Sequence, residues 1–152
     1  MYIMRKSFYI PVPAGSVKPW IWVGGARSGV LYYFFSIKQK ENSYIFNGLN
    51  ILNERDALQH QNQYPVIFIT LKDMKNNSFE KQKTMFSILI QEILRSNQEL
   101  LNSKQINEFD KEQIINLYRR TQNEVELQNA LKFISECLKQ HYNKKVIILI
   151  DE

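Results

Sequence analysis

From residue 30 onward, apolar and polar positions alternate in a way that predicts strands separated by helices. The run PVIFITL follows a proline and is rich in β-branched and aromatic residues, which predicts a central strand over residues 66–71. The run VIILI predicts a second strand over residues 146–150. Because strands with continuous apolar runs are buried on both faces, both runs favour a parallel sheet covered by helices, and hence an α/β fold.

Four segments of the chain have apolar patterns that are typical of helices. VLYYFFSI, at residues 30–37, is apolar on most sides, which predicts a buried helix. The other three helices are expected to begin at cap-like polar residues, namely Asn77, Asp110 and Thr121. The last helix is expected to end at Asn143. Its apolar stripe comprises Leu127, Ala130, Leu131, Ile134, Cys137 and Leu138.

The composition changes near residue 30. Both tryptophans, three of the four prolines and four of the five glycines lie before it. We therefore expect residues 1–29 to be an atypical, poorly ordered segment and residues 30–152 to be one domain.

Charge and composition argue against several classes of protein. The net charge of +5 comes without a basic cluster, so a solvated lysine-rich surface is favoured and nucleic-acid binding is not expected. Since no apolar run approaches the ~20 residues of a membrane span, no membrane contact is expected. The lone Cys137 is predicted to be a core thiol, which fits a cytoplasmic protein. His60 and His141 lack the spacing of metal ligands.

The aliphatic run near residue 150 leads directly into two carboxylates, Asp151 and Glu152. In an open parallel sheet, binding sites gather at the carboxyl ends of the strands. An aliphatic strand followed by Asp-Glu is the Walker B pattern of P-loop NTPases. There the first carboxylate supports Mg²⁺, usually through water, and the second orients the attacking water. A buried strand that ends in solvated acids would give the same pattern, so both interpretations remain open.

The candidate for a phosphate-binding loop is the stretch GGARSGVL. Gly24 and Gly29 have the spacing of the two glycines in G-x-x-x-x-G-K-[ST], which makes them candidates for nucleotide binding. However, Val30 and Leu31 stand where that motif has its lysine and its hydroxyl residue. The stretch therefore lacks a phosphate cation and a Mg²⁺ ligand, and we favour a glycine-rich surface loop.

Five segments of the later chain occur in a family's order: VLYYFFS, FNGLNI, YPVIFITLKDMK, ELQNALKFISECLKQHY and KKVIILIDE. Through them residues 30–152 resemble the AAA-ATPase-like family of bacterial proteins. The resemblance implies a partial P-loop NTPase core, with helices on both faces of a parallel sheet, that binds and hydrolyses ATP with Mg²⁺. It also implies that Asp151 is the metal-associated aspartate and Glu152 the catalytic, water-orienting glutamate.

The chain departs from the family pattern in two places. It stops at Glu152, where longer members continue, so we expect the N-terminal part of an ATPase that is inactive as it stands. The alternative is a non-catalytic interaction module that pairs the exposed edge of its last strand with another protein or a second copy.

The second departure is that the family's loop sequence RPRRFGKTL is missing. The codons of residues 11–22 can be read in a shifted frame that starts at the third base of each codon. Because the third base is variable at most positions, the shifted codons can encode RPRRFGKTL. We therefore predict a frameshift over the phosphate-binding loop, with the normal frame restored near Val30.

Overall fold

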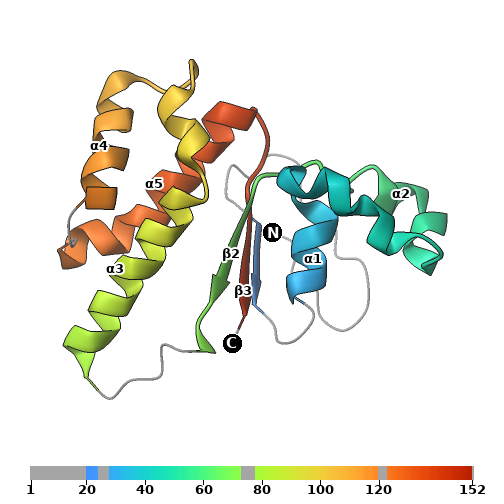
Figure 1. The fold of residues 1–152 in the computed structure, drawn as a ribbon, viewed down its shortest axis with the longest axis horizontal. Helices are drawn as coiled ribbons and strands as arrows, with labels where there is room; N and C mark the ends of the chain where they lie inside the picture. The colour runs from blue at the N-terminus through green and yellow to red at the C-terminus, as the bar shows by residue number, and fades with distance from the viewer. Residues whose placement is uncertain (1–19, 24–27, 73–77, 120–122, 152) are drawn as a thin grey trace. The chain divides into compact units, whose positions relative to one another are not determined.

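The computed structural model describes residues 20–23, 28–72, 78–119 and 123–151. The chain divides into two compact units, one formed by Met1–Thr70 with Lys144–Glu152 and the other by Leu71–Asn143. The first unit contains a parallel sheet with helix α1 packed on it, and the second consists of helices (Figure 1).

The sheet of the first unit has three parallel strands, in the order β1-β3-β2. They are β1 (Trp20–Val23), β2 (Val66–Thr70) and β3 (Ile147–Asp151). Both expected strands and the α/β class are confirmed. The expectation that residues 66–71 form a central strand is wrong, because β2 lies at an edge of the described sheet. β3 has a neighbour on each side, so the last strand is not an exposed edge either.

Helix α1 (Ser28–Phe35) packs on one face of this sheet. The ring centroids of Tyr32 and Phe68 of β2 lie 5.8 Å apart. The expected helix at residues 30–37 is thus confirmed, although it begins and ends two residues earlier. Its burial on most sides is not confirmed, because Phe34 is buried but Val30 is 53% exposed.

The connection from α1 to β2 is made of short helical turns: η1 (Ile37–Phe46), η2 (Asn50–Asn53) and α2 (Arg55–Leu58). It returns to the end of α1 through Asn62, which is 5% exposed and adopts a left-handed backbone with φ of 53°. The Asn62 backbone N–H donates to the Phe34 carbonyl at 2.7 Å. Its side-chain amide donates to the carbonyls of Tyr33 and Ser36 at 2.9 and 2.8 Å.

The second unit contains α3 (Phe79–Arg95), η4 (Gln98–Asn102), α4 (Glu108–Arg119) and α5 (Glu124–Tyr142). The three expected helices are confirmed. The buried residues of α5 are the expected stripe, with Leu131 only partly buried. None of the helices in the described ranges is long and apolar enough to cross a membrane.

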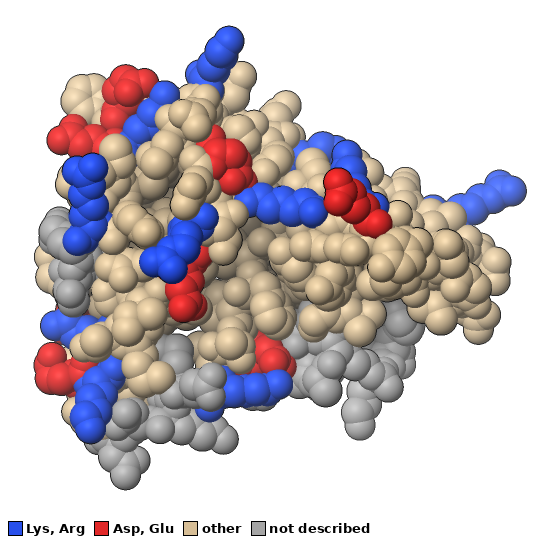
Figure 2. Space-filling model, viewed as in Figure 1, with Lys and Arg blue, Asp and Glu red and all other residues tan. Residues whose placement is uncertain are grey.

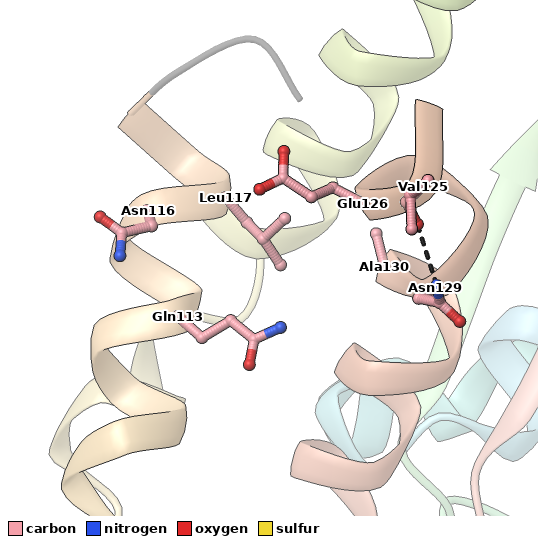
Figure 3. Close-up of a pocket in the computed structure, with 7 residues that line it drawn as sticks. All are labelled: Gln113, Asn116, Leu117, Val125, Glu126, Asn129 and Ala130. Atoms are coloured by element: carbon pink, nitrogen blue, oxygen red, sulfur yellow. Dashed lines mark hydrogen bonds between the residues drawn. The ribbon is translucent and has the colours of Figure 1, made fainter. Parts of the chain in front are cut away.

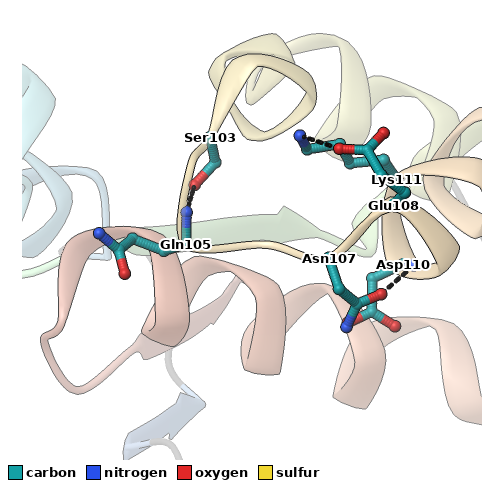
Figure 4. A network of polar contacts seen from close by, with 6 residues as sticks. All are labelled: Ser103, Gln105, Asn107, Glu108, Asp110 and Lys111. Atoms are coloured by element: carbon teal, nitrogen blue, oxygen red, sulfur yellow. Dashed lines mark hydrogen bonds and ion pairs between the residues drawn. The ribbon is translucent and has the colours of Figure 1, made fainter.

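The helix starts differ from those expected. Ser78 is the N-cap of α3 and makes no side-chain capping bond, and Asn77 lies outside the described residues. Helix α4 begins after Asn107, which exchanges hydrogen bonds of 2.8 and 2.7 Å with Asp110 (Figure 4). Asn123 is the N-cap of α5, and Thr121 lies outside the described residues.

Candidate functional site

The carboxyl ends of the three strands meet at one edge of the sheet, because all three are parallel. At this edge β1 ends at Val23, and the chain enters α1 at Ser28. β3, the neighbour of β1, ends there at Asp151. The first unit therefore has the strand–connection–helix order that a phosphate-binding loop requires, with an aspartate at the end of the adjacent strand.

The orientation of α1 places its first turn at the same edge. Ser36, just after the helix, forms a parallel bridge with Tyr64, just before β2. The helix thus ends near the start of the strands and runs opposite to them, so Gly29 lies toward the carboxyl edge. Apart from its neighbours along the chain and the helix backbone, no atom of the described residues lies within 4 Å of a Cβ atom added at Gly29, so the described part of the chain leaves open space beside this turn.

Asp151 lies on the face of the sheet that α1 covers. It is the register partner of Thr70, and Phe68, two residues earlier on β2, contacts Tyr32 of α1. Register partners in a parallel sheet point to the same face, as do residues two apart on one strand. Asp151 is 7% exposed, whereas Thr70 is exposed. Thr70 has no signal of its own in the sequence, because only the register shows that it lies beside Asp151.

The metal side of this edge fits a hard cation such as Mg²⁺. The Asp151 carboxylate and the neighbouring Thr70 hydroxyl provide oxygen, which Mg²⁺ prefers. In the described ranges no group of three or more His, Cys, Asp or Glu side chains could hold a metal ion. An ion at this edge would therefore rely on Asp151, on water and on the phosphates of a substrate, a common arrangement for Mg²⁺.

The residues that would contact the phosphates fit a nucleotide site less well. Val30 and Leu31 follow Gly29 in the first turns of α1, where the phosphate-binding motif has a cation and a hydroxyl. The candidates Gly24 and Glu152 lie outside the described residues. Among the candidates named from the sequence, the structure thus describes Gly29 and Asp151 at one edge.

Cys137 and His60, which were also considered from the sequence, have surroundings that are typical of residues with a structural role. Cys137 is 1% exposed, and burial, with smaller contributions from Asp110 and Glu136, raises the pKa of its thiol to about 12. Such a thiol is a poor nucleophile because it stays protonated. The His60 Nδ1 lies 2.5 Å from the Tyr64 hydroxyl, and the two rings are stacked.

A cleft of about 230 Å³ opens between α4 and α5 in the second unit (Figure 3). Its lining consists of Gln113, Asn116, Leu117, Val125, Glu126, Asn129 and Ala130. Its single ionisable side chain, Glu126, accepts a hydrogen bond from the Asn123 backbone in the cap of α5. The cleft therefore offers amide groups and apolar contacts but no evident catalytic group.

Lysine and arginine side chains are interspersed with acidic ones on the face drawn in Figure 2. Some form ion pairs within helices, such as Lys111 with Glu108 at 2.8 Å. This mixed pattern is typical of a solvated surface.

The family model described as a predicted AAA-ATPase matches residues 28–152, from the first residue of α1 to the residue after β3. No curated protein and no solved structure matched the chain.

Proposed function

Since the chain belongs to the AAA-ATPase-like family, we propose that the carboxyl edge of its sheet is a site for ATP and Mg²⁺ on a P-loop-type core with helices on both faces of the sheet. The observation that carries this proposal is the position of Asp151. Its carboxylate stands at the end of the strand next to β1, on the face covered by the helix that follows β1.

The residues of the chain would divide the work at this site. Asp151 would hold the water shell of the cation, and Gly29 leaves room for the nucleotide beside the first turn of α1. By family resemblance, Glu152 would orient water. The bound cation would neutralise charge on the phosphates.

We further propose that this chain hydrolyses ATP slowly or not at all. Val30 and Leu31 provide neither a positive charge for the phosphates nor a hydroxyl for the metal. Loss of one preorganised group that stabilises developing charge typically costs about 3–4 kcal/mol in the barrier. The frameshift hypothesis accounts separately for the missing RPRRFGKTL at residues 11–22, and it is tested by translating the DNA that encodes those residues in its other frames. If RPRRFGKT is absent there, that hypothesis is wrong.

Binding of a fluorescent ATP analogue, measured with Mg²⁺ and with EDTA, tests the site. We expect micromolar binding that needs Mg²⁺ and falls at least about tenfold, or 1.4 kcal/mol, in Asp151→Ala. Glu41→Ala, which removes an exposed carboxylate from the same unit, is the matched control and should bind like the wild type. Equal binding by Asp151→Ala and the wild type would contradict the proposal, as would the absence of Mg²⁺-dependent binding.

A gain-of-function variant provides an independent test. Val30→Lys restores a cation at the motif position, and the exposure of Val30 allows the longer side chain without loss of packing. We expect this variant to bind the analogue more tightly than the wild type. Lys38→Gln, which alters an exposed cation beyond α1, should leave binding unchanged.

A non-catalytic interaction module is the second candidate. Four large apolar side chains in the connection between α1 and β2 are exposed, namely Tyr44, Ile45, Leu49 and Leu58. Exposed apolar groups that gather in one segment often mark a protein-binding surface. This candidate predicts a defined oligomer in size-exclusion chromatography that Leu49→Ser disperses, together with no nucleotide binding.

A further inference from the structure

We propose that the Thr70 hydroxyl shares the water shell of the bound cation with Asp151, and thereby supplies the hydroxyl that Leu31 cannot. The inference rests on the proposed nucleotide site and adds a residue that the phosphate-binding and Asp-Glu motifs do not include. Thr70 would be a positioning residue, because it acts on the cation through water.

The strand register places Thr70 beside Asp151. The two residues are Cα partners at the carboxyl ends of β2 and β3. Adjacent strands are about 4.8 Å apart and partner side chains share a face, so one hydrated ion can reach both oxygens. Thr70 is exposed at the end of an edge strand, so solvent reaches this residue beside the buried carboxylate.

The ring contact between Tyr32 and Phe68 shows that α1 borders the same space. From Tyr32, Gly29 lies three residues back along the helix, a rise of about 4.5 Å. From Phe68, Thr70 lies two residues on along the strand, a rise of about 6.6 Å. Helix and strand run in opposite directions, so both steps lead to the carboxyl edge. The open space at Gly29 and the Thr70 hydroxyl therefore lie on the same side of the sheet.

The chemistry of Mg²⁺ favours this arrangement. The ion gives up its water reluctantly and is usually held by one or two carboxylates with several waters kept. Those waters need acceptors, which a carboxylate and a hydroxyl oxygen provide. In a P-loop the hydroxyl comes from the first turn of the helix, and here that position is Leu31.

The test compares variants of the full chain by the ratio of analogue affinity with Mg²⁺ to affinity with EDTA. Thr70→Val removes the hydroxyl while keeping a β-branched side chain suited to a strand, so the variant should fold. We expect it to lower the ratio at least fivefold. Thr70→Ser keeps the hydroxyl and should stay within twofold of the wild type. Thr84→Val removes an exposed threonine hydroxyl from α3 and should change nothing.

The outcomes separate this inference from the proposed function. If Thr70→Val keeps the wild-type ratio while Asp151→Ala loses it, the nucleotide site stands and the role of Thr70 is wrong. If Thr70→Ser lowers the affinity ratio as much as Thr70→Val does, the hydroxyl is not responsible for Mg²⁺-dependent binding. The inference is then likewise overturned. If the wild type shows no Mg²⁺-dependent binding, both proposals fail. Urea unfolding of each variant checks that the fold is intact.

Discussion

Asn62 shows how a single buried amide can define the end of a helix. The last turn of α1 leaves carbonyl groups without helical partners, and Asn62 donates to two of them, those of Tyr33 and Phe34. It also donates to the carbonyl of Ser36, just after the helix. Asparagine suits the position for two reasons. It tolerates a left-handed backbone better than most residues, and its side chain carries two N–H donors.

Replacing this amide should destabilise the first unit. In Asn62→Asp the side chain becomes an acceptor that faces the carbonyls of Tyr33 and Ser36, so two hydrogen bonds are lost and a charge is buried. We expect the free energy of unfolding in urea to fall by about 1–3 kcal/mol or more.

Two further variants make this prediction specific. Asn62→Gly keeps the left-handed backbone accessible and should cost less than Asn62→Ala, which strains it. Asn129→Ala removes an exposed amide that bonds a backbone carbonyl within α5, and it should change stability by less than about 0.5 kcal/mol. Equal losses at Asn62 and Asn129 would show that burial of the Asn62 amide does not matter.

The Cys137 thiol predicts a pH dependence of stability. Burial raises its pKa from the ordinary 9.0 to about 12. Between these values the thiol ionises in the unfolded chain but stays protonated in the folded one. The stabilisation is therefore complete below pH 9 and is lost as the pH rises toward 12. Urea unfolding at pH 8 and pH 10 should show a fall of about 1 kcal/mol from this group.

The variant Cys137→Ala isolates this contribution. It should be less stable than the wild type at pH 8, because it leaves a small cavity in α5's packed stripe. Its stability should nevertheless fall less steeply between pH 8 and pH 10. Parallel pH profiles for the two proteins would contradict a buried, protonated thiol.

At the scale of residues, only part of the candidate site could be predicted from the sequence. Asp151 follows an aliphatic run, which is a local pattern that indicates the end of a buried strand. Thr70 ends its strand without such a signal, and it becomes a candidate only through its register with Asp151, which lies far away in the sequence. Contacts of this kind depend on strand register, and a run that is apolar at every position lacks the alternation that would define the register.

At the scale of elements, the helices were predictable but their first residues were not. Apolar stripes recur over many residues and identified all three helices of the second unit. The first residue of a helix depends on a single N-cap residue, and this chain has several polar residues near the start of each helix. Around α5 both Thr121 and Asn123 have a glutamate three residues on, and the Asn123 pair is the one that forms the reciprocal bonds.

This cap should contribute measurably to stability. Asn123 and Glu126 exchange two hydrogen bonds of 2.9 Å across the first turn of α5. We expect Asn123→Ala to lower the unfolding free energy by about 1 kcal/mol and Asn123→Ser to restore most of it. Ser78→Ala is the matched change at α3, where the cap side chain makes no bond, and it should cost clearly less. An equal fall in unfolding free energy for Asn123→Ala and Ser78→Ala would contradict a stabilising cap at Asn123.

At the scale of the whole molecule, the sequence predicted a parallel sheet but not the order of its strands. A continuous apolar run indicates burial on both faces, and that signal is the same for an edge and for a centre when helices cover the sheet. β2 and β3 both have such runs, yet β2 lies at an edge of the described sheet and β3 between its neighbours.

Hydrogen exchange of backbone amides tests the strand order. Consecutive amides of a strand point to opposite sides, so β3 has partners for all of them, whereas a strand at an edge has partners for every second one. We expect slow exchange at successive amides of Ile147–Asp151 and alternating slow and fast exchange along Val66–Thr70. Alternating protection in β3 would show that one of its neighbours is misplaced.

The central position of β3 also implies an order of events during synthesis. β1 and β2 do not pair with each other, and the strand that joins them is made after both. As the nascent chain leaves the ribosome, β1 and β2 stay unpaired until β3 has emerged. The helices between β2 and β3 can form earlier, because they depend on local contacts. Unpaired strands attract other chains during such a delay, so early binding by a chaperone would be most useful before residue 147 emerges.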